Sequence, residues 1–78
     1  MRFAKMPAVS QQVAEPSSTI YWRISRGEFV PPFKQGERAA AFDLDEVEQI
    51  QRARAAGVTR DEICALVRKL VDARRAAA

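Results

Sequence analysis

The positions of proline and glycine limit this chain to short structural segments. Pro16 disfavours helical geometry at the residue before it, and Gly27 is of a residue type that commonly ends a helix. Pro31 and Pro32 favour extended geometry, and Gly57 is a further candidate for a helix end. The chain is therefore expected to fold as several short elements joined by tight connections.

Hydrophobic periodicity predicts two short helices before Gly27. Apolar residues at helical spacing predict a helix over residues 7–14, with Pro7 in its first turn. The chain is expected to bend before Pro16, and a second helix over residues 17–26 follows at once. Two short helices separated by a tight turn are typical of a helix-turn-helix.

The helical period is lost after the second helix. Residues 30–42 contain two prolines followed by Gln35 and Gly36, a pattern that predicts a small β-hairpin with a tight turn. Lys34 and Arg38 are expected near the tip of this hairpin. In a helix-turn-helix protein such a hairpin would form a wing.

A capping box predicts the start of each of two further helices. Asp43 with Glu46 opens the first, which ends at Gly57, and Thr59 with Glu62 opens the second. The second helix carries an amphipathic stripe that consists of Ile63, Leu66, Val67 and Leu70. Two interpretations of this stripe are open, because it can close the core or pair with the same helix of another chain.

The order helix, turn, helix, hairpin, helix, helix predicts a mainly α fold. Residues 1–57 are expected to hold two short helices, a β-hairpin and a third helix, and the family resemblance given below implies that they form a small winged helix-turn-helix domain with the hairpin as its wing. Residues 58–78 add a C-terminal amphipathic helix, for core closure or oligomerisation. A chain of 78 residues is near the lower size at which one hydrophobic core suffices.

The second helix has one face for the core and another for a partner. Ile20 and Ile24 point the same way on a helical wheel, with Ser17 between them, and are expected to face the core. Tyr21 and Arg23 flank that face. The far side carries Ser18, Thr19, Trp22, Ser25 and Arg26. An exposed Trp among hydroxyl groups and arginines is typical of a surface that contacts another molecule.

The excess positive charge is confined to the first half of the chain. Residues 1–42 hold six basic and three acidic side chains, whereas residues 43–78 hold seven of each, which together give the net charge of +3. This asymmetry indicates an anionic partner, with nucleic acid as the first candidate. No stretch approaches the roughly 20 apolar residues of a membrane span, and the N-terminus lacks the apolar run of a signal peptide. A single Cys cannot form an internal disulfide, so we expect a reducing cytoplasm.

An enzyme is not expected. The chain has no His, one Cys and three Gly, so it lacks a Ser–His or Cys–His pair, the usual zinc ligands and a phosphate-cradling loop. Negative charge is favoured at the start of a helix, and we interpret four acidic residues in this way rather than as a metal site. They are Asp43, Asp45, Glu46 and Glu48. No cofactor and no small-molecule substrate are expected.

An ordered set of short motifs runs from Val9 to Ile50. The motifs are Ser18-Thr19-Ile20-Tyr21, Gly27-Glu28-Phe29, Pro31-Pro32-Phe33-Lys34, Gly36-Glu37-Arg38, Phe42 and Asp45-Glu46-Val47. In this order and at nearly this spacing they resemble the AlpA-type regulators of phages and mobile elements. These are small winged helix-turn-helix proteins of the MerR-like superfamily, which also includes many excisionases.

The sequence departs from the pattern of that family in and after the turn. Ala14 and Glu15 stand where the family usually has a Gly and an apolar residue. Trp22 and Arg23 are exchanged relative to the more frequent order, which would place the large ring outward.

The resemblance implies a sequence-specific protein for double-stranded DNA that acts as a transcriptional regulator, a recombination directionality factor, or both. The recognition helix, residues 17–26, would enter the major groove, and the wing, residues 30–42, would lie on the backbone or in the minor groove. The residues implied in DNA binding are Ser17, Ser18, Thr19, Tyr21, Trp22, Arg23, Arg26, Lys34 and Arg38.

Trp22 and Arg26 have more than one possible role in such a complex. Trp22 contacts thymine methyl groups or sugars, packs against a neighbouring subunit on DNA, or caps the core. Arg26 reaches either a phosphate or the edge of a guanine.

Small domains of this kind gain affinity by binding in more than one copy. We therefore expect a homodimer or oligomer on DNA, with the stripe of the last helix as the candidate interface. A recombinase (integrase) or RNA polymerase is a further candidate partner, and no membrane is expected to be one. The alternative function is a small adaptor that binds such a protein through the Trp22 surface. The expected location is the cytoplasm, in association with the nucleoid.

Overall fold

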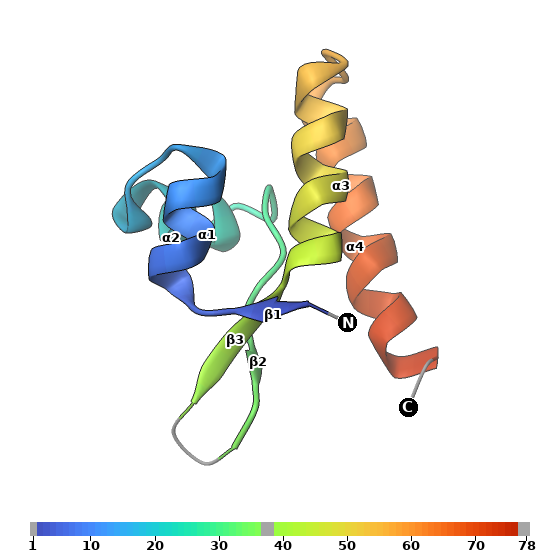
Figure 1. The fold of residues 1–78 in the computed structure, drawn as a ribbon. Coiled ribbons are helices and arrows are strands. Elements are labelled where there is room, and N and C mark those ends of the chain that lie inside the picture. Colours follow the sequence, from blue (N-terminus) through green and yellow to red (C-terminus); the bar gives the residue numbers. More distant parts are fainter. Residues whose placement is uncertain (1, 37–38, 77–78) are drawn as a thin grey trace.

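The helix-turn-helix occupies the first part of the computed structural model, which describes residues 2–36 and 39–76 (Figure 1). Strand β1 (Phe3–Ala4) leads into helix α1 (Met6–Val13), and helix α2 (Ser17–Ser25) follows after a short turn. Both helices lie within one residue of their predicted bounds. The predicted helix-turn-helix is therefore confirmed.

The turn between α1 and α2 begins at Ala14 rather than at the expected bend before Pro16. Ala14 has φ 59° and ψ 38°, the left-handed conformation that Gly adopts at lower cost. The N–H groups of Ala14 and Glu15 both donate to the carbonyl of Ser10 and close the last turn of α1. The position at which AlpA-type sequences usually have Gly is thus the one that needs a positive φ.

The wing is a β-hairpin to which the N-terminal strand is added. Strands β2 (Phe33–Lys34) and β3 (Ala40–Asp43) are antiparallel, with Phe33 opposite Ala41. Strand β1 pairs with the other edge of β3, so that the order in the sheet is β1-β3-β2. The predicted wing residue Arg38 lies outside the described residues.

Helices α3 (Leu44–Ala55) and α4 (Arg60–Ala76) run side by side in opposite directions and form the second half of the molecule (Figure 1). The capping box that opens α4 is confirmed. The N–H of Glu62 donates to Thr59 Oγ1 at 3.2 Å, and the N–H of Thr59 donates to Glu62 Oε1 at 3.3 Å.

The capping box predicted at the start of α3 is only half formed. Asp43 accepts a hydrogen bond from the N–H of Asp45 at 2.8 Å, as an N-cap residue does. Glu46 instead is buried and accepts from Arg74 Nε of α4 at 2.9 Å. Arg74 also donates to the carbonyl of Pro31 at 2.8 Å. A buried carboxylate without a charged partner costs more free energy than a missing capping hydrogen bond at a helix start. Glu46 therefore pairs with Arg74, and the second half of the capping box does not form.

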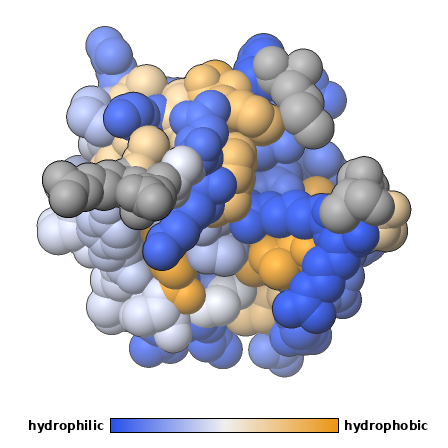
Figure 2. All heavy atoms as spheres, turned by 90° about the horizontal axis from the view of Figure 1, so that it is seen from below, coloured by the Kyte–Doolittle hydropathy of each residue, from blue (hydrophilic) through white to orange (hydrophobic). Residues whose placement is uncertain are grey.

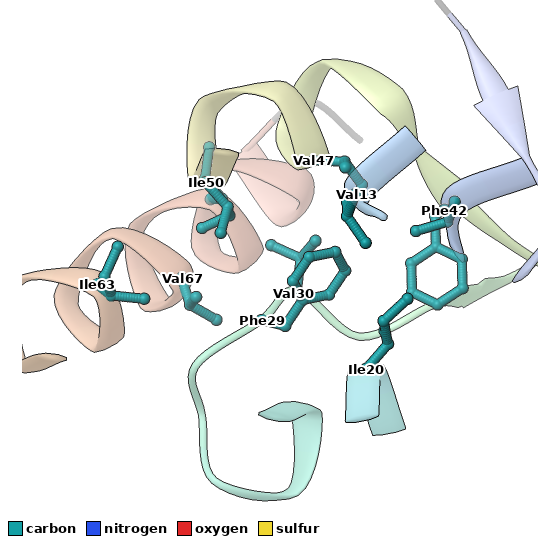
Figure 3. Close-up of a cluster of buried hydrophobic side chains, with 11 residues drawn as sticks. Val13, Ile20, Phe29, Val30, Phe42, Val47, Ile50, Ile63 and Val67 are labelled. Carbon is teal, nitrogen blue, oxygen red and sulfur yellow. The ribbon is translucent and has the colours of Figure 1, made fainter. Parts of the chain in front are cut away.

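One hydrophobic core connects all parts of the fold. Figure 3 shows buried side chains that come from all four helices, among them Val13, Ile20, Ile50 and Ile63. The core cluster consists of Val9, Val13, Ile20, Phe29, Val30, Phe42, Val47, Ile50, Ile63, Val67 and Leu70. Three of the four stripe residues of α4 thus pack against residues before Gly57, and Leu66 is partly buried against the same cluster.

These elements confirm the predicted fold class. The protein is mainly helical, with a small winged helix-turn-helix and an additional C-terminal helix. Within residues 2–36 and 39–76, no helix is both long and apolar enough to cross a membrane.

Candidate nucleic-acid interface

Helix α2 is fixed to the core by one face and leaves the other face in solvent. Ile20 is fully buried and Ile24 packs against the core from its edge, as the helical wheel predicts. Two backbone hydrogen bonds close the last turn of the helix. The N–H of Gly27 donates to the carbonyl of Ile24, and the N–H of Glu28 donates to the carbonyl of Arg23. Gly27 supplies the positive φ of 74° that this ending needs.

The outward face of α2 carries two large aromatic side chains. Tyr21 and Trp22 are each 53% exposed. The interpretation in which Trp22 caps the core is therefore wrong. Ser17 and Ser18 are also exposed, whereas Thr19, predicted on the far side, is half-buried. Solvent-exposed rings on one short helix form a surface that a partner can cover.

Arg26 is held in place between Trp22 and Glu28. Its guanidinium lies over the Trp22 ring, with Cζ 4.8 Å from the ring centroid. Its Nε donates to Glu28 Oε2 at 2.8 Å. The side chain of Arg26 stays 45% exposed, so this fixed orientation is presented to solvent.

Arg23 has a different environment from the other predicted contact residues. Its Nη2 and Nε donate to the two carboxylate oxygens of Glu15, at 2.8 and 3.2 Å. Both side chains are less than a third exposed. This two-pronged pair joins α2 to the turn that precedes it, and Glu15 and Arg23 are two of the four residues at which the sequence departs from the AlpA pattern.

The N-terminus of α2 presents free backbone donors to solvent. Pro16 occupies the N-cap position and provides no side-chain cap, and no acidic residue lies in the first turn. The described residues supply no backbone acceptor for the N–H groups of Ser17 and Ser18. A helix N-terminus with unpaired N–H groups favours an anion.

The acidic residues of α3 are engaged in ion pairs. Arg2 Nη2 lies 2.7 Å from both Asp45 Oδ1 and Glu48 Oε2, and Arg52 reaches Glu48 one turn later. Hydrogen bonding to Arg2 lowers the pKa of Glu48. In the described part of the chain, no three His, Cys, Asp or Glu residues are placed to hold a metal ion.

A groove of about 440 Å³ lies on another face, between the sheet, α3 and α4. Figure 2 views the molecule from below, where hydrophobic residues reach the surface between hydrophilic ones. The groove is lined by Phe3, Phe33, Asp43, Asp45, Glu46, Gln49, Leu70, Ala73 and Arg74. None of the residues on the outward face of α2 contributes to it.

Three residues beside α2 were missed by the sequence analysis. Glu28 is 12% exposed, and its carboxylate meets Arg60 Nε at 3.5 Å as well as Arg26. Arg54 Nη2 donates to the carbonyl of Glu28 at 2.8 Å. The hydrogen bond from Arg26 lowers the pKa of Glu28, and burial lowers the pKa of Arg54. Of these three residues, only Glu28 could have been found from the sequence, because it lies two residues after Arg26. Arg54 and Arg60 are distant from Glu28 in the sequence, so no local pattern points to their contacts with it.

Of the predicted wing residues, Lys34 is exposed at the end of β2. Ser17, Ser18, Tyr21, Trp22 and Arg26 are all exposed, and the structure brings Trp22 and Arg26 into direct contact. Lys34 lies apart from them on the hairpin, as a wing residue does.

Comparison with known proteins finds a family that matches the first part of the chain. A family model described as "Prophage CP4-57 regulatory protein (AlpA)" matches residues 2–55, from before β1 to the end of α3. The matched segment covers the helix-turn-helix and the wing but not α4. No curated protein and no solved structure matches the chain.

Proposed function

Because this chain belongs to the AlpA family of prophage regulatory proteins, we propose that it is a sequence-specific DNA-binding protein whose recognition helix is α2. The family is one of regulatory DNA-binding proteins. The observation that supports α2 as the recognition helix is its outward face. On that face Trp22 and Arg26 stack on each other in solvent while Ile20 is fully buried.

In the proposed complex α2 lies in the major groove of double-stranded DNA. A backbone phosphate binds at the start of the helix. It accepts hydrogen bonds from the free N–H groups and hydroxyls of Ser17 and Ser18, and Thr19 lies beside it. The hydroxyl group of Tyr21 donates a hydrogen bond to a second phosphate. The Trp22 ring contacts thymine methyl groups or sugars from within the groove.

The basic side chains complete the proposed interface. Arg26 extends it at the end of α2, and Lys34 and Arg38 of the wing bind the neighbouring backbone or minor groove. Arg23 donates its Nε and Nη2 hydrogens to Glu15, and the other edge of its guanidinium contacts a phosphate in the proposed complex. Each phosphate contact contributes about 0.9 to the slope of log affinity against log salt.

We also propose that more than one copy binds to a site, because one small interface supplies limited affinity. Ile63, Val67 and Leu70 are largely buried within one chain, which leaves the partly exposed Leu66 as the residue of the stripe best placed for pairing. Residues 1–57 are proposed as the DNA-binding part, with residues 58–78 as its support.

The same interface serves a transcriptional regulator and a recombination directionality factor, and the two differ in what they do to DNA. A directionality factor bends attachment-site DNA for its recombinase. Gel mobility of circularly permuted fragments tests for this bend, because a bend in the middle of a fragment slows its complex most. An unbent complex argues against a directionality factor, whereas regulators also include proteins that bend DNA.

The proposal is tested by the variant Trp22→Ala in a binding titration with labelled duplex DNA. Trp22 is about half exposed, so we expect its loss to change the free energy of unfolding by less than about 1 kcal/mol. DNA affinity is expected to fall at least about tenfold, which corresponds to the loss of one good groove contact. The exposed Arg68 of α4 supplies the matched control, Arg68→Ala.

Unchanged affinity in Trp22→Ala would contradict the assignment of α2. If the wild type binds DNA only weakly and without salt dependence, yet binds a recombinase or polymerase through the Trp22 surface, the adaptor function is correct instead.

A further inference from the structure

Arg60 lies at the start of α4, outside the segment matched by the AlpA model, yet it sits beside the end of α2. Its Nη2 is 3.5 Å from the carbonyl of Arg26, and its Nε is 3.5 Å from Glu28 Oε2. Thirty-four residues separate Arg26 from Arg60 in the sequence. The fold therefore extends the surface of the recognition helix with a residue from the last helix.

Positive charge exceeds negative charge at this point. Glu28 Oε2 accepts the hydrogen bond from Arg26 and faces Arg60, so one carboxylate is shared by two guanidinium groups. The backbone carbonyl of Glu28 meets a third, that of Arg54. Two acidic residues follow Arg60 in α4: Asp61 is exposed, and Glu62 accepts a hydrogen bond from Thr59 Oγ1 at 3.0 Å. Two positively charged groups that share one carboxylate carry a net positive charge, which attracts a second anion.

The shared carboxylate is covered, whereas the arginines are open. The side chain of Glu28 is 12% exposed, while those of Arg26 and Arg60 are 45% and 51% exposed. Arg26 also lies over the exposed ring of Trp22. The outer edges of the two guanidinium groups are thus available to a large anionic partner that already covers α2.

We propose that Arg60, together with Arg26, binds the phosphate backbone of DNA at the C-terminal end of α2. Helix α4 then belongs to the DNA interface and does more than close the core. Arginine suits this task because its planar fork binds phosphate oxygens with two parallel hydrogen bonds. This inference rests on the proposed function of α2, and it adds a contact from outside the family segment.

The test is the salt dependence of affinity for the full chain with the variants Arg60→Ala and Arg60→Lys. A duplex that carries the preferred site and a random duplex are titrated at several salt concentrations. Arg60→Ala is expected to lower the slope of log affinity against log salt by about 0.9 on both duplexes, because one phosphate contact is lost. Arg60→Lys keeps the charge and is expected to keep the slope. Arg68→Ala, exposed on the same helix, is the control and is also expected to keep the slope.

Three results would overturn the inference while leaving α2 as the recognition helix. The first is a wild-type slope in Arg60→Ala, and the second is a slope lost equally in Arg68→Ala. The third is a changed ratio between the two duplexes, which would mean that the side chain reads a base rather than a phosphate. A wild-type protein that binds neither duplex would contradict the proposed function itself. Circular dichroism melts of the variants confirm that each is folded.

Discussion

At the scale of single residues, Ala14 is the one non-glycine residue with a positive φ in the described part of the chain. Helices α2 and α3 each end with Gly in the left-handed conformation, at Gly27 and Gly57, whereas α1 ends with Ala at φ 59°. An L-residue in this conformation costs about 1 kcal/mol relative to Gly. We therefore expect Ala14→Gly to raise the free energy of unfolding by about 1 kcal/mol, or the melting temperature by about 4–8 °C.

Chemical denaturation of the wild type and the variant measures this difference. Gly57→Ala is the matched reverse change, since an added Cβ at Gly57 meets no atom within 4 Å and only the backbone conformation is affected. It should destabilise by a similar amount. A destabilised Ala14→Gly would show that the gain in chain entropy on unfolding outweighs the backbone strain.

The residue-scale features divide into those that a sequence pattern reaches and those that it does not. The buried Ile20 and the exposed Trp22 follow from helical period alone, because both sit on one regular helix. The pair of Glu15 with Arg23 and the sharing of Glu28 with Arg60 depend on how segments pack. No local pattern encodes such contacts.

At the scale of elements, α4 is fixed to the wing and to α3 by Arg74. Its guanidinium pairs with the buried Glu46, donates to the carbonyl of Pro31 and lies 5.7 Å from the Phe33 ring centroid. The hydrogen bond with Glu46 raises the pKa of Arg74. The sequence predicted both helices but assigned Glu46 to a capping box, because the same spacing suits a cap and an inward-facing carboxylate.

Removal of one partner from this pair is expected to be costly. Arg74→Ala leaves the carboxylate of Glu46 buried without its charged donor, so we expect a loss of about 2 kcal/mol or more in the free energy of unfolding. Urea denaturation measures this loss, and Arg75→Ala, at an exposed neighbouring position, serves as the control. Equal stability of the two variants would mean that the pair contributes nothing.

At the scale of the whole molecule, one core spans the predicted boundary between residues 57 and 58. Ile63, Val67 and Leu70 of α4 belong to the same cluster as Val47 and Ile50 of α3. The succession of elements could be predicted from proline, glycine and hydrophobic period. The joint core could not be predicted, because the apolar stripe of α4 is equally suited to pack against another chain. The path of the turn at Gly57 determines which of the two surfaces the stripe meets.

A chain that ends at residue 57 is therefore expected to lose cooperative folding. Without α4 the apolar face of α3 is exposed, and a domain of this size has little stability in reserve. A thermal melt followed by circular dichroism should change from a sigmoidal transition to a broad one. A sigmoidal melt in the shortened chain would establish residues 1–57 as an independent domain, with α4 as an appendage.

The proposed binding of DNA by the outward face of α2 can be followed through the fluorescence of Trp22. Trp22 is the only Trp in the chain, so its signal reports on α2 alone. Duplex DNA, first of random sequence and then from beside the protein's own gene, is titrated at several salt concentrations. We predict saturable quenching that is tighter on one fragment, with a log–log salt slope of about −4 for four or five phosphate contacts. An unchanged signal, with no DNA binding by a second method, would contradict the assignment of α2 as a DNA-binding helix.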